Sequence, residues 1–230
     1  MSDKVVAVVQ ARMGSTRLPN KAMLWLNGYP VIEWVIRRLR RCERLDDIIV
    51  AIPHAGISRE NSVLGEYVAR RGVEATGTIN ENNVLNRILV AAEVKQADYV
   101  VRVCGDCPFV SPSVVDDLVE RFMEIEVDYM YNHIPRSNLY PDGLGAEIVS
   151  FETLELLHQR AKGSEQIEHA FNHIWDNLGM YRMSTFNPPD PCLHHPELKL
   201  DLDTYEDYQR LLASGVDIDM TAAEIVRCFL

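Results

Sequence analysis

The sequence predicts an α/β fold in which a mostly parallel central sheet carries helices on both of its faces. One observation is the run of mainly β-branched residues from Lys4 to Gln10, which leads into a polar loop and is typical of a fully buried strand. Another is that strand-like and helix-like segments alternate from there to about Glu126. Strands that alternate with helices build parallel sheets covered on both faces, so the two observations favour the same fold class.

The other elements of this alternating half follow from apolar spacing and from residues that start helices. Pro30 precedes a segment in which Val31, Trp34, Val35 and Leu39 share one face, so a helix is expected there. Further helices are expected to begin after Ser58, at Asn82 or Asn83, and at Ser111-Pro112. Buried strands are expected at 48–52 and 99–104, and a short strand is expected at 73–76.

After Asp128 the sequence no longer alternates in this way. Strands are expected at 129–133, 145–149 and 180–186, and helices at 151–162, at 165–176, near 205–213 and from 222 onward. We expect one domain, residues 1–230, in which residues 128–190 form a small α+β extension packed beside the first sheet. This extension is expected to carry the pocket for a second substrate and a dimer contact.

Charge and cysteine content limit the partners and the compartment of the protein. Its 34 acidic residues exceed its 23 basic ones, and the resulting net charge of −11 argues against nucleic acid as the partner. Five cysteines in a chain of 230 residues are expected to be free thiols in a reducing compartment. No apolar stretch approaches the roughly 20 residues of a membrane-spanning helix. We therefore expect a soluble, cytoplasmic protein without a membrane partner.

The segment from Lys4 to Ile32 reverses this acidic balance, because it contains four basic residues and no acidic one. Its central part reads ARMGSTRLPNK and directly follows the first predicted strand. Gly14 lets a phosphate approach the backbone closely, and Ser15 and Thr16 add amide and hydroxyl donors. The loop also contains three cations, Arg12, Arg17 and Lys21. Several positive charges in one loop suit the several anionic oxygens of a triphosphate.

This loop differs from the two common phosphate-binding motifs, since it matches neither G-x-x-x-x-G-K-[ST] nor G-x-G-x-x-G. The alternative interpretation is a solvated basic loop that contains a turn glycine. The position of the loop favours phosphate binding, because it follows a buried strand and has no acidic residue nearby.

Aspartates at two distant places are candidate ligands for a divalent cation. Asp106 follows the predicted strand 99–104, and Gly105 beside it leaves room for a ligand. Asp201 and Asp203 are expected on one face of another strand. Magnesium bound with a nucleotide takes one or two carboxylates together with phosphate oxygens and water, so one aspartate from each segment would suffice. The alternatives are a turn aspartate at 106 and a helix N-cap at 203.

The predicted strand order brings these candidates into one place. Ligands of parallel α/β sheets bind beyond the carboxyl ends of the strands. We therefore expect a single crevice formed by residues 10–21, 53–56, 77–83 and 105–108.

Four blocks of the sequence, taken together, are the most specific signal. They are Ala11–Lys21, Asn83–Arg87, Val101–Pro108 and Leu202–Tyr208. In this order they resemble the cytidylyltransferase family of CMP-sugar-acid synthetases, and most of all its spore coat polysaccharide biosynthesis protein F subgroup. The resemblance implies a glycosyltransferase-A-like nucleotidyltransferase fold, CTP as the donor and Mg²⁺ as the required ion. It also implies that an acidic sugar attacks CTP and that pyrophosphate leaves, for surface polysaccharide biosynthesis.

The resemblance assigns roles to individual residues. The nucleotide-binding residues would be Ala11, Arg12, Met13, Gly14, Ser15, Arg17, Lys21, Arg87, Arg102 and Gly105. Arg12, Lys21 and Asp106 would act in catalysis, with Lys21 on the leaving pyrophosphate. Asp106 and Asp203 match the metal carboxylates of the family. For Arg87 a surface helix position is the alternative, and for Arg102 a structural ion pair.

The acceptor side is carried by two further blocks, Tyr140–Glu147 and Glu168-His169, which resemble second-domain segments of the subgroup. Asp142, Glu147 and His169 are the residues expected to contact the sugar. Octulosonate enzymes carry other residues here, so a nonulosonic acid is at least as well supported as an octulosonic one. Two other functions stay open, a glycosyltransferase of the same fold that uses a nucleotide sugar, and a nucleotide-binding partner without chemistry.

A cysteine pair offers a weaker alternative. Cys104 and Cys107 form a C-x-x-C sequence, but Pro108 follows and the next helix begins later, whereas a redox motif opens a helix. Together with Cys192–His195 the pair would make a zinc site of no standard spacing. The sequence therefore assigns no role to either cysteine.

Overall fold

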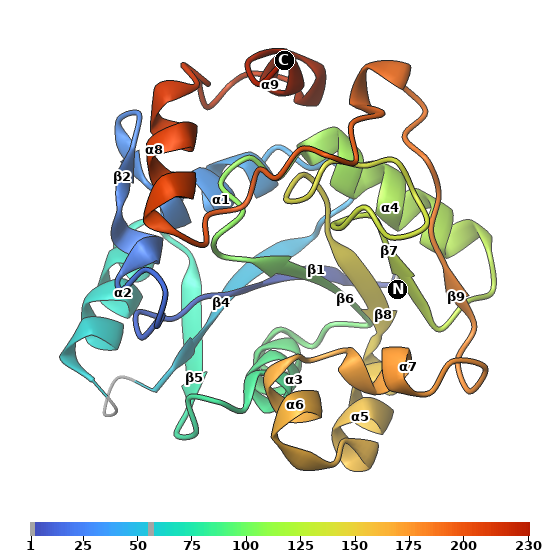
Figure 1. Ribbon diagram of the computed structural model, residues 1–230. Helices are drawn as coiled ribbons and strands as arrows, with labels where there is room; N and C mark the ends of the chain where they lie inside the picture. Colours follow the sequence, from blue (N-terminus) through green and yellow to red (C-terminus); the bar gives the residue numbers. More distant parts are fainter. Residues whose placement is uncertain (1–2, 55–57) are drawn as a thin grey trace.

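Figure 1 shows the computed structural model of the protein, which describes residues 3–54 and 58–230. Its centre is a seven-stranded sheet. In spatial order the strands are β5 (Glu74–Thr78), β4 (Asp47–Pro53), β1 (Val5–Gln10), β6 (Tyr99–Cys104), β8 (Glu147–Ser150), β7 (Tyr129–Tyr131) and β9 (Met183–Ser184). Strand β8 runs antiparallel to β6 and β7, and the other pairs are parallel. The predicted mostly parallel sheet is confirmed.

The order of the strands creates a crevice at the carboxyl ends of β1 and β6. From β1 the sheet grows in one direction through β4 and β5 and in the other direction through β6. The loops after β1 and β6 therefore diverge, and parallel α/β sheets bind their ligands at such a point. Gln10 lies opposite Cys104 in the register, so the segments 11–21 and 105–108 start side by side.

Helices cover both faces of the sheet, as the sequence predicts. One core contains residues of α1 (Val31–Leu39), α2 (Arg59–Arg70) and α4 (Pro112–Glu124). The core on the other face contains residues of α3 (Val84–Lys95), α5 (Phe151–Arg160) and α7 (Asn172–Asp176). The short α6 (Gly163–Glu168) packs beside α3. In Figure 1, α1 and α4 lie above the sheet, and α3 and α5 lie below it.

Strand β1 belongs to both cores, because successive side chains of a strand point to opposite faces. Val5, Ala7 and Val9 contribute to the first core, and Val6 and Val8 contribute to the second. Burial of each valine stabilises the fold by about 1.5 kcal/mol or more relative to an exposed position. A strand with apolar residues on both faces is therefore favoured only in the middle of a covered sheet.

A third core holds the C-terminal part of the chain against the sheet layers. It joins the hairpin of β2 (Trp25–Leu26) and β3 (Tyr29–Pro30) to η2 (Pro191–Leu193), α8 (Tyr205–Ala213) and α9 (Ala222–Arg227). Trp34 and Phe109 meet edge to face in it, with ring centroids 5.5 Å apart. Leu200 and Leu202 are fully buried there, and Leu202 N donates to Asp106 O at 2.8 Å. The segment 200–203 is thereby fixed at the crevice.

The region 128–190 differs from the expected extension beside the first sheet. Its strands β7, β8 and β9 pair with that sheet and complete it. The helix expected at 165–176 is broken into α6 and α7, because Ala170 and Phe171 between them turn into the second core. The strand expected at 180–186 is reduced to β9.

Two smaller features also differ from the expectations. The hairpin β2–β3 has no counterpart among the predicted elements, and residues 201–203 form an irregular segment instead of a strand. Part of the predicted crevice segment 53–56, namely Ala55 and Gly56, lies outside the described residues. Within the described ranges, no helix combines the length and the apolar character needed to cross a membrane.

Candidate active site

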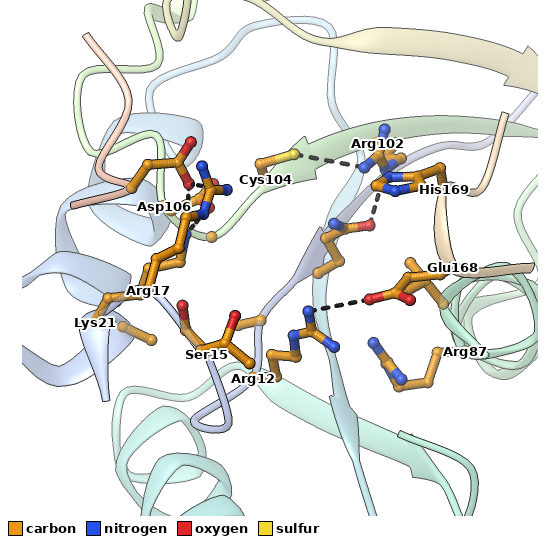
Figure 2. A pocket seen from close by; sticks show the side chains of 17 residues that line it. Arg12, Ser15, Arg17, Lys21, Arg87, Arg102, Cys104, Asp106, Glu168 and His169 are labelled. Atoms are coloured by element: carbon orange, nitrogen blue, oxygen red, sulfur yellow. Dashed lines mark hydrogen bonds and ion pairs between the residues drawn. The ribbon is translucent and has the colours of Figure 1, made fainter. Parts of the chain in front are cut away.

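A pocket of about 290 Å³ lies in the crevice at the carboxyl ends of β1 and β6. Figure 2 shows its side chains, which come from the loop after β1, from α3, from the end of β6 and from more distant segments of the chain. The predicted site residues that line it are Ala11, Arg12, Ser15, Arg17, Lys21, Arg87, Arg102, Gly105, Asp106, His169 and Asp203.

The ammonium of Lys21 lies between the two predicted metal carboxylates. Lys21 begins the 3-10 helix η1 (Lys21–Met23), and its Nζ contacts Asp106 Oδ2 and lies 3.1 Å from Asp203 Oδ1. Nζ also donates to the carbonyl oxygen of Leu202 at 3.0 Å. Burial alone would lower the pKa of Lys21, but the charges and hydrogen bonds of Asp106 and Asp203 raise it above its ordinary value. Both carboxylates are therefore near enough to share one cation.

Asp203 reaches the pocket because its neighbours cap helix α8. Thr204 is the N-cap, and the Asp207 carboxylate accepts hydrogen bonds from the backbone of Thr204 at 3.0 Å and of Asp203 at 3.1 Å. The Asp203 side chain takes no part in the cap and pairs with Lys21 and, at 2.9 Å, with Arg17. Burial opposes ionisation, yet Lys21 and Arg17 hold the pKa of Asp203 below its usual value. The alternative interpretation of Asp203 as a helix N-cap is wrong.

Asp106 sits in the turn after β6, where the backbone is held from two sides. Gly105 N donates to Gln10 O at 2.8 Å, and Leu202 N donates to Asp106 O at 2.8 Å. A Cβ at position 105 would lie 2.8 Å from Gln10 O and 2.9 Å from Ala11 Cβ. Glycine is therefore required here by the close approach of β1 and β6. From the sequence, we expect glycine at position 105 to leave room for a ligand. The structure shows instead that the close packing of the two backbones requires it.

Two half-buried aspartates extend the acidic group beyond Asp106 and Asp203. Burial, and then repulsion from Asp201, raise the pKa of Asp142 to about 7. Burial also raises the pKa of Asp201, although the charge of Lys199 opposes the shift. Burial is the larger cause of both shifts, and repulsion among the carboxylates adds to it.

The donor set around Lys21 fits a magnesium ion that is bound together with phosphates. Magnesium prefers oxygen ligands, and Asp106 and Asp203 both contact one cationic position. Among residues 3–54 and 58–230, no group of three or more His, Cys, Asp and Glu side chains is arranged to hold a metal. An ion at this place would therefore complete its coordination with oxygens of a ligand and with water.

The other end of the pocket holds Arg12, Arg87 and Glu168. In Figure 2, Arg87 and Glu168 lie on the right, and Arg12 lies below the centre and points toward Glu168. Arg12 Nη2 lies 3.2 Å from Glu168 Oε1. Arg87 is 2% exposed, and it donates to the carbonyl oxygen of Glu81 at 2.7 Å while its Nε has no hydrogen-bond partner. Burial, and then the charge of Arg12, lower the pKa of Arg87 to about 10. The surface alternative for Arg87 is wrong.

Arg102 lines the pocket and is also part of a buried ion pair, the structural alternative considered for it. Its Nε donates to Gln10 Oε1 at 2.9 Å, and its Nη1 contacts Glu147 Oε1. Glu147 is buried in β8, where Tyr129 donates to Oε2 at 2.8 Å and His133 Nε2 lies 3.1 Å from Oε1. Burial opposes ionisation, but Arg102 and then His133 hold the pKa of Glu147 below its usual value.

The match to a known protein family covers nearly the whole chain, since the model of the cytidylyltransferase family fits residues 6–225. This protein belongs to the cytidylyltransferase family. It is therefore a nucleotidyltransferase, and the family match decides against the glycosyltransferase alternative.

Two relatives and one solved structure show which known proteins this cytidylyltransferase resembles. The spore coat polysaccharide biosynthesis protein SpsF of Bacillus subtilis is 26% identical over 231 residues, which cover 96% of this chain and 92% of SpsF. A 3-deoxy-manno-octulosonate cytidylyltransferase of Bdellovibrio bacteriovorus is 33% identical over 122 residues, which cover 53% of this chain and 47% of that enzyme. The structure of a cytidylyltransferase from Leptospira borgpetersenii superimposes with a TM-score of 0.87 at 24% identity, covers 98% of this chain and 93% of its own, and shows the same fold.

Four of the predicted site residues of this cytidylyltransferase do not line the pocket, and their roles stay predictions. Met13 is buried, and its N lies 3.3 Å from Asn61 Oδ1. The other three are Gly14, Asp142 and Glu147.

The pocket also contains polar residues that the sequence-based site set leaves out. They are Gln10, Thr16, Cys104 and Glu168. Gln10 is the polar end of a buried strand and Thr16 lies inside the phosphate loop, so their positions are signals that point to the site. Glu168 belongs to the block Glu168-His169 that the resemblance places on the acceptor side, but its pairing with Arg12 has no local signal, because only the fold brings the two residues together.

Proposed function

We propose that this cytidylyltransferase transfers CMP from CTP to an acidic sugar of the nonulosonic or octulosonic type, releases pyrophosphate and requires Mg²⁺. The observation that carries the proposal is the contact of one ammonium, that of Lys21, with both Asp106 and Asp203 in a pocket that also holds Arg12 and Arg17. Two carboxylates and several cations in one pocket suit a metal-bound triphosphate.

The similar proteins support the class of product. SpsF is named for the biosynthesis of a spore coat polysaccharide, and the Bdellovibrio relative is named for 3-deoxy-manno-octulosonate. The first name points to a polysaccharide precursor and the second to an acidic sugar, and an activated acidic sugar is compatible with both names and with the cationic pocket. The match to the octulosonate enzyme covers 53% of this chain and 47% of that enzyme, so the proposal keeps both sugar classes.

In the proposed reaction, the anomeric hydroxyl of the sugar attacks the α-phosphorus of CTP and gives up its proton to solvent. The bond between the α-phosphorus and the oxygen that bridges it to the β-phosphorus breaks, and that oxygen leaves with pyrophosphate. Catalysis of such a transfer depends mainly on positioning and on the neutralisation of charge. When bound, Mg²⁺ supplies Lewis-acid stabilisation of the phosphate oxygens. Asp106 and Asp203 would hold it, Lys21 would neutralise the leaving pyrophosphate, and Arg12 and Arg17 would orient the triphosphate.

The acceptor would bind on the side of the pocket formed by the region 128–190. His169 of this region lines the pocket, and Glu168 beside it contacts Arg12. Asp142 and Glu147 stay predicted acceptor contacts. The homodimer and the cytoplasmic location also stay predictions, and light scattering on the purified protein tests the first of them.

The proposal is tested by pyrophosphate release from the purified protein with Mg²⁺, one nucleoside triphosphate at a time, and a panel of sugar acids. We expect release with CTP well above UTP or GTP, loss of release with a chelator, and recovery on addition of excess Mg²⁺. Asp106→Asn should lower the rate of release strongly. Asp217→Asn makes the same chemical change at an exposed residue outside the pocket and should leave release intact. Turnover of a nucleotide sugar without pyrophosphate would overturn the proposal.

A further inference from the structure

We propose that Cys104 and Cys107 are an oxidation site, at which a reversible disulfide closes across the turn that carries Asp106 and switches off the nucleotide pocket. Cys104 ends β6, and Cys107 immediately follows Asp106. The effect on catalysis rests on the proposed function, because it depends on the role of Asp106. The formation of the bridge does not depend on it.

The two cysteines occupy the first and last positions of a hydrogen-bonded turn. Cys107 N donates to Cys104 O at 3.1 Å, and residues 105 and 106 form the turn between them. The ends of such a four-residue turn have Cα atoms less than about 7 Å apart. Disulfides join cysteines whose Cα atoms are about 4.4–6.8 Å apart. The backbone therefore holds the two thiols near bridging distance.

The pair combines one accessible thiol with one buried thiol. Cys104 is half-buried and lines the pocket, and Arg102 Nη2 donates to its Sγ at 3.6 Å. Cys107 is 8% exposed, and its Sγ donates to Asp106 Oδ1 at 3.9 Å. An oxidant that enters the pocket meets Cys104 first and finds Cys107 behind it as the resolving thiol.

A hydroperoxide supplies the oxidant for the reaction. The sulfur of Cys104 attacks one peroxide oxygen, the O–O bond breaks, and water leaves when hydrogen peroxide is the oxidant, so Cys104 becomes a sulfenic acid. The sulfur of Cys107 then attacks Cys104 Sγ, the S–O bond breaks, and the hydroxyl leaves as water with the proton of the Cys107 thiol. Together the two thiols lose two electrons, and one hydrogen peroxide takes them up and becomes two waters.

Closure of the bridge changes the surroundings of Asp106 directly. Cys107 loses the hydrogen that it donates to the Asp106 carboxylate, and the sulfur of Cys104 leaves Arg102. The turn also carries the backbone bond from Leu202 N to Asp106 O, which links it to the segment of Asp203. A displacement of about 1 Å at a reacting centre costs on the order of a hundredfold in rate. We expect a loss of this size.

Peptide mass spectrometry on the full chain tests the bridge without reference to activity. The protein is treated with hydrogen peroxide, alkylated and digested with trypsin, which releases both cysteines in one peptide, Val103–Arg121. We expect this peptide to lose two hydrogens and to resist alkylation, and dithiothreitol should restore two alkylatable thiols. Pyrophosphate release should fall and recover in parallel.

Variants at other cysteines provide the controls. A Cys192→Ser/Cys228→Ser double variant removes two exposed cysteines outside the pocket and should form the same bridge with the same loss of activity. Cys107→Ser should form no bridge and should leave a sulfenic acid at Cys104 that a dimedone probe captures.

Two results would overturn the proposal. In the first, Cys104 and Cys107 remain fully alkylated while Cys192 and Cys228 are oxidised. In the second, the bridge forms and pyrophosphate release is unchanged. A reduced protein that releases no pyrophosphate from CTP would instead refute the proposed function, and the peptide mass would still decide whether the bridge forms.

Discussion

Asp106 and Asp203 belong to segments far apart in the sequence, and the fold brings both carboxylates into contact with the same ammonium, that of Lys21. The backbone bond from Leu202 N to Asp106 O, 2.8 Å long, holds the two segments together. Neither carboxylate is used in a helix cap, so both are available to a ligand in the pocket.

The first prediction concerns Lys21. Lys21→Met removes the cation between the carboxylates and, in the proposed reaction, the charge that neutralises the leaving pyrophosphate. We expect pyrophosphate release to fall by about a hundredfold or more, as for the loss of one donor to a transition-state charge. Lys95→Met is the matched control, because Lys95 also bridges two carboxylates, Asp47 at 3.0 Å and Glu74 at 3.1 Å, away from the pocket. Equal losses in the two variants would argue against a catalytic role of Lys21.

The second prediction concerns Glu168, which holds Arg12 at 3.2 Å. If Arg12 binds the triphosphate, the carboxylate competes with the phosphates for it. Glu168→Gln should therefore tighten CTP binding by about twofold, the size expected for a partly exposed ion pair. Isothermal titration measures the change. Glu165→Gln, on the exposed side of the same helix, should leave binding unchanged. Weaker binding in the Glu168 variant would show that Glu168 positions Arg12 instead.

The third prediction concerns Glu147, which pairs with Arg102 in the core of the sheet. Glu147→Gln leaves a buried guanidinium without its counter-charge, so we expect the free energy of unfolding to fall by about 3 kcal/mol. The double variant Arg102→Met/Glu147→Met removes both charges and should lose less than the sum of its single variants. Urea unfolding measures these differences. A Glu147→Gln protein of full stability with a raised KM for the sugar would support the predicted acceptor contact.

The fourth prediction concerns the pH dependence of stability at Glu33, a buried residue of α1. Burial opposes its ionisation, but hydrogen bonds from Tyr67, Arg37 and Arg71 hold its pKa below the usual value. A carboxyl whose folded pKa lies below its unfolded value of about 4.3 contributes full stability above that pH. The contribution is lost as the pH falls through the folded pKa.

Glu33→Gln should therefore cost about 2 kcal/mol in the free energy of unfolding at pH 7. The difference from the unaltered protein should shrink in acid. Glu66→Gln is the control, because its pair with Arg70 is exposed and should contribute little. A Glu33 effect that stays constant in acid would show that the charge of Glu33 is not its source.

Local sequence was sufficient to predict the parts of the fold that depend on local physics. The apolar residues of β1 and the cations of the loop after it each carry their own signal, and the strand order then places Asp106 at the crevice. The break between α6 and α7 was not predictable in this way. It depends on Ala170 and Phe171 reaching a core that forms only when distant elements pack.

The same distinction applies within the site. The sequence identified Gly105 but not its reason, because the close approach of Gln10 and Ala11 exists only in the sheet. It also placed Glu168 in an acceptor-side block without predicting its partner, since that partner is Arg12, on a segment far away in the chain. Residues whose roles depend on long-range contacts are the ones that the structure adds or reinterprets.

The central claim is that Asp106 and Asp203 hold the same ion, and a double-mutant cycle on pyrophosphate release tests it most directly. The rates of Asp106→Asn, Asp203→Asn and the double variant are compared at saturating Mg²⁺ and CTP. The effects of mutating groups that act on one ion are strongly non-additive. We therefore expect the double variant to be only slightly less active than the less active of the two single variants. Losses that multiply independently would contradict a shared ion.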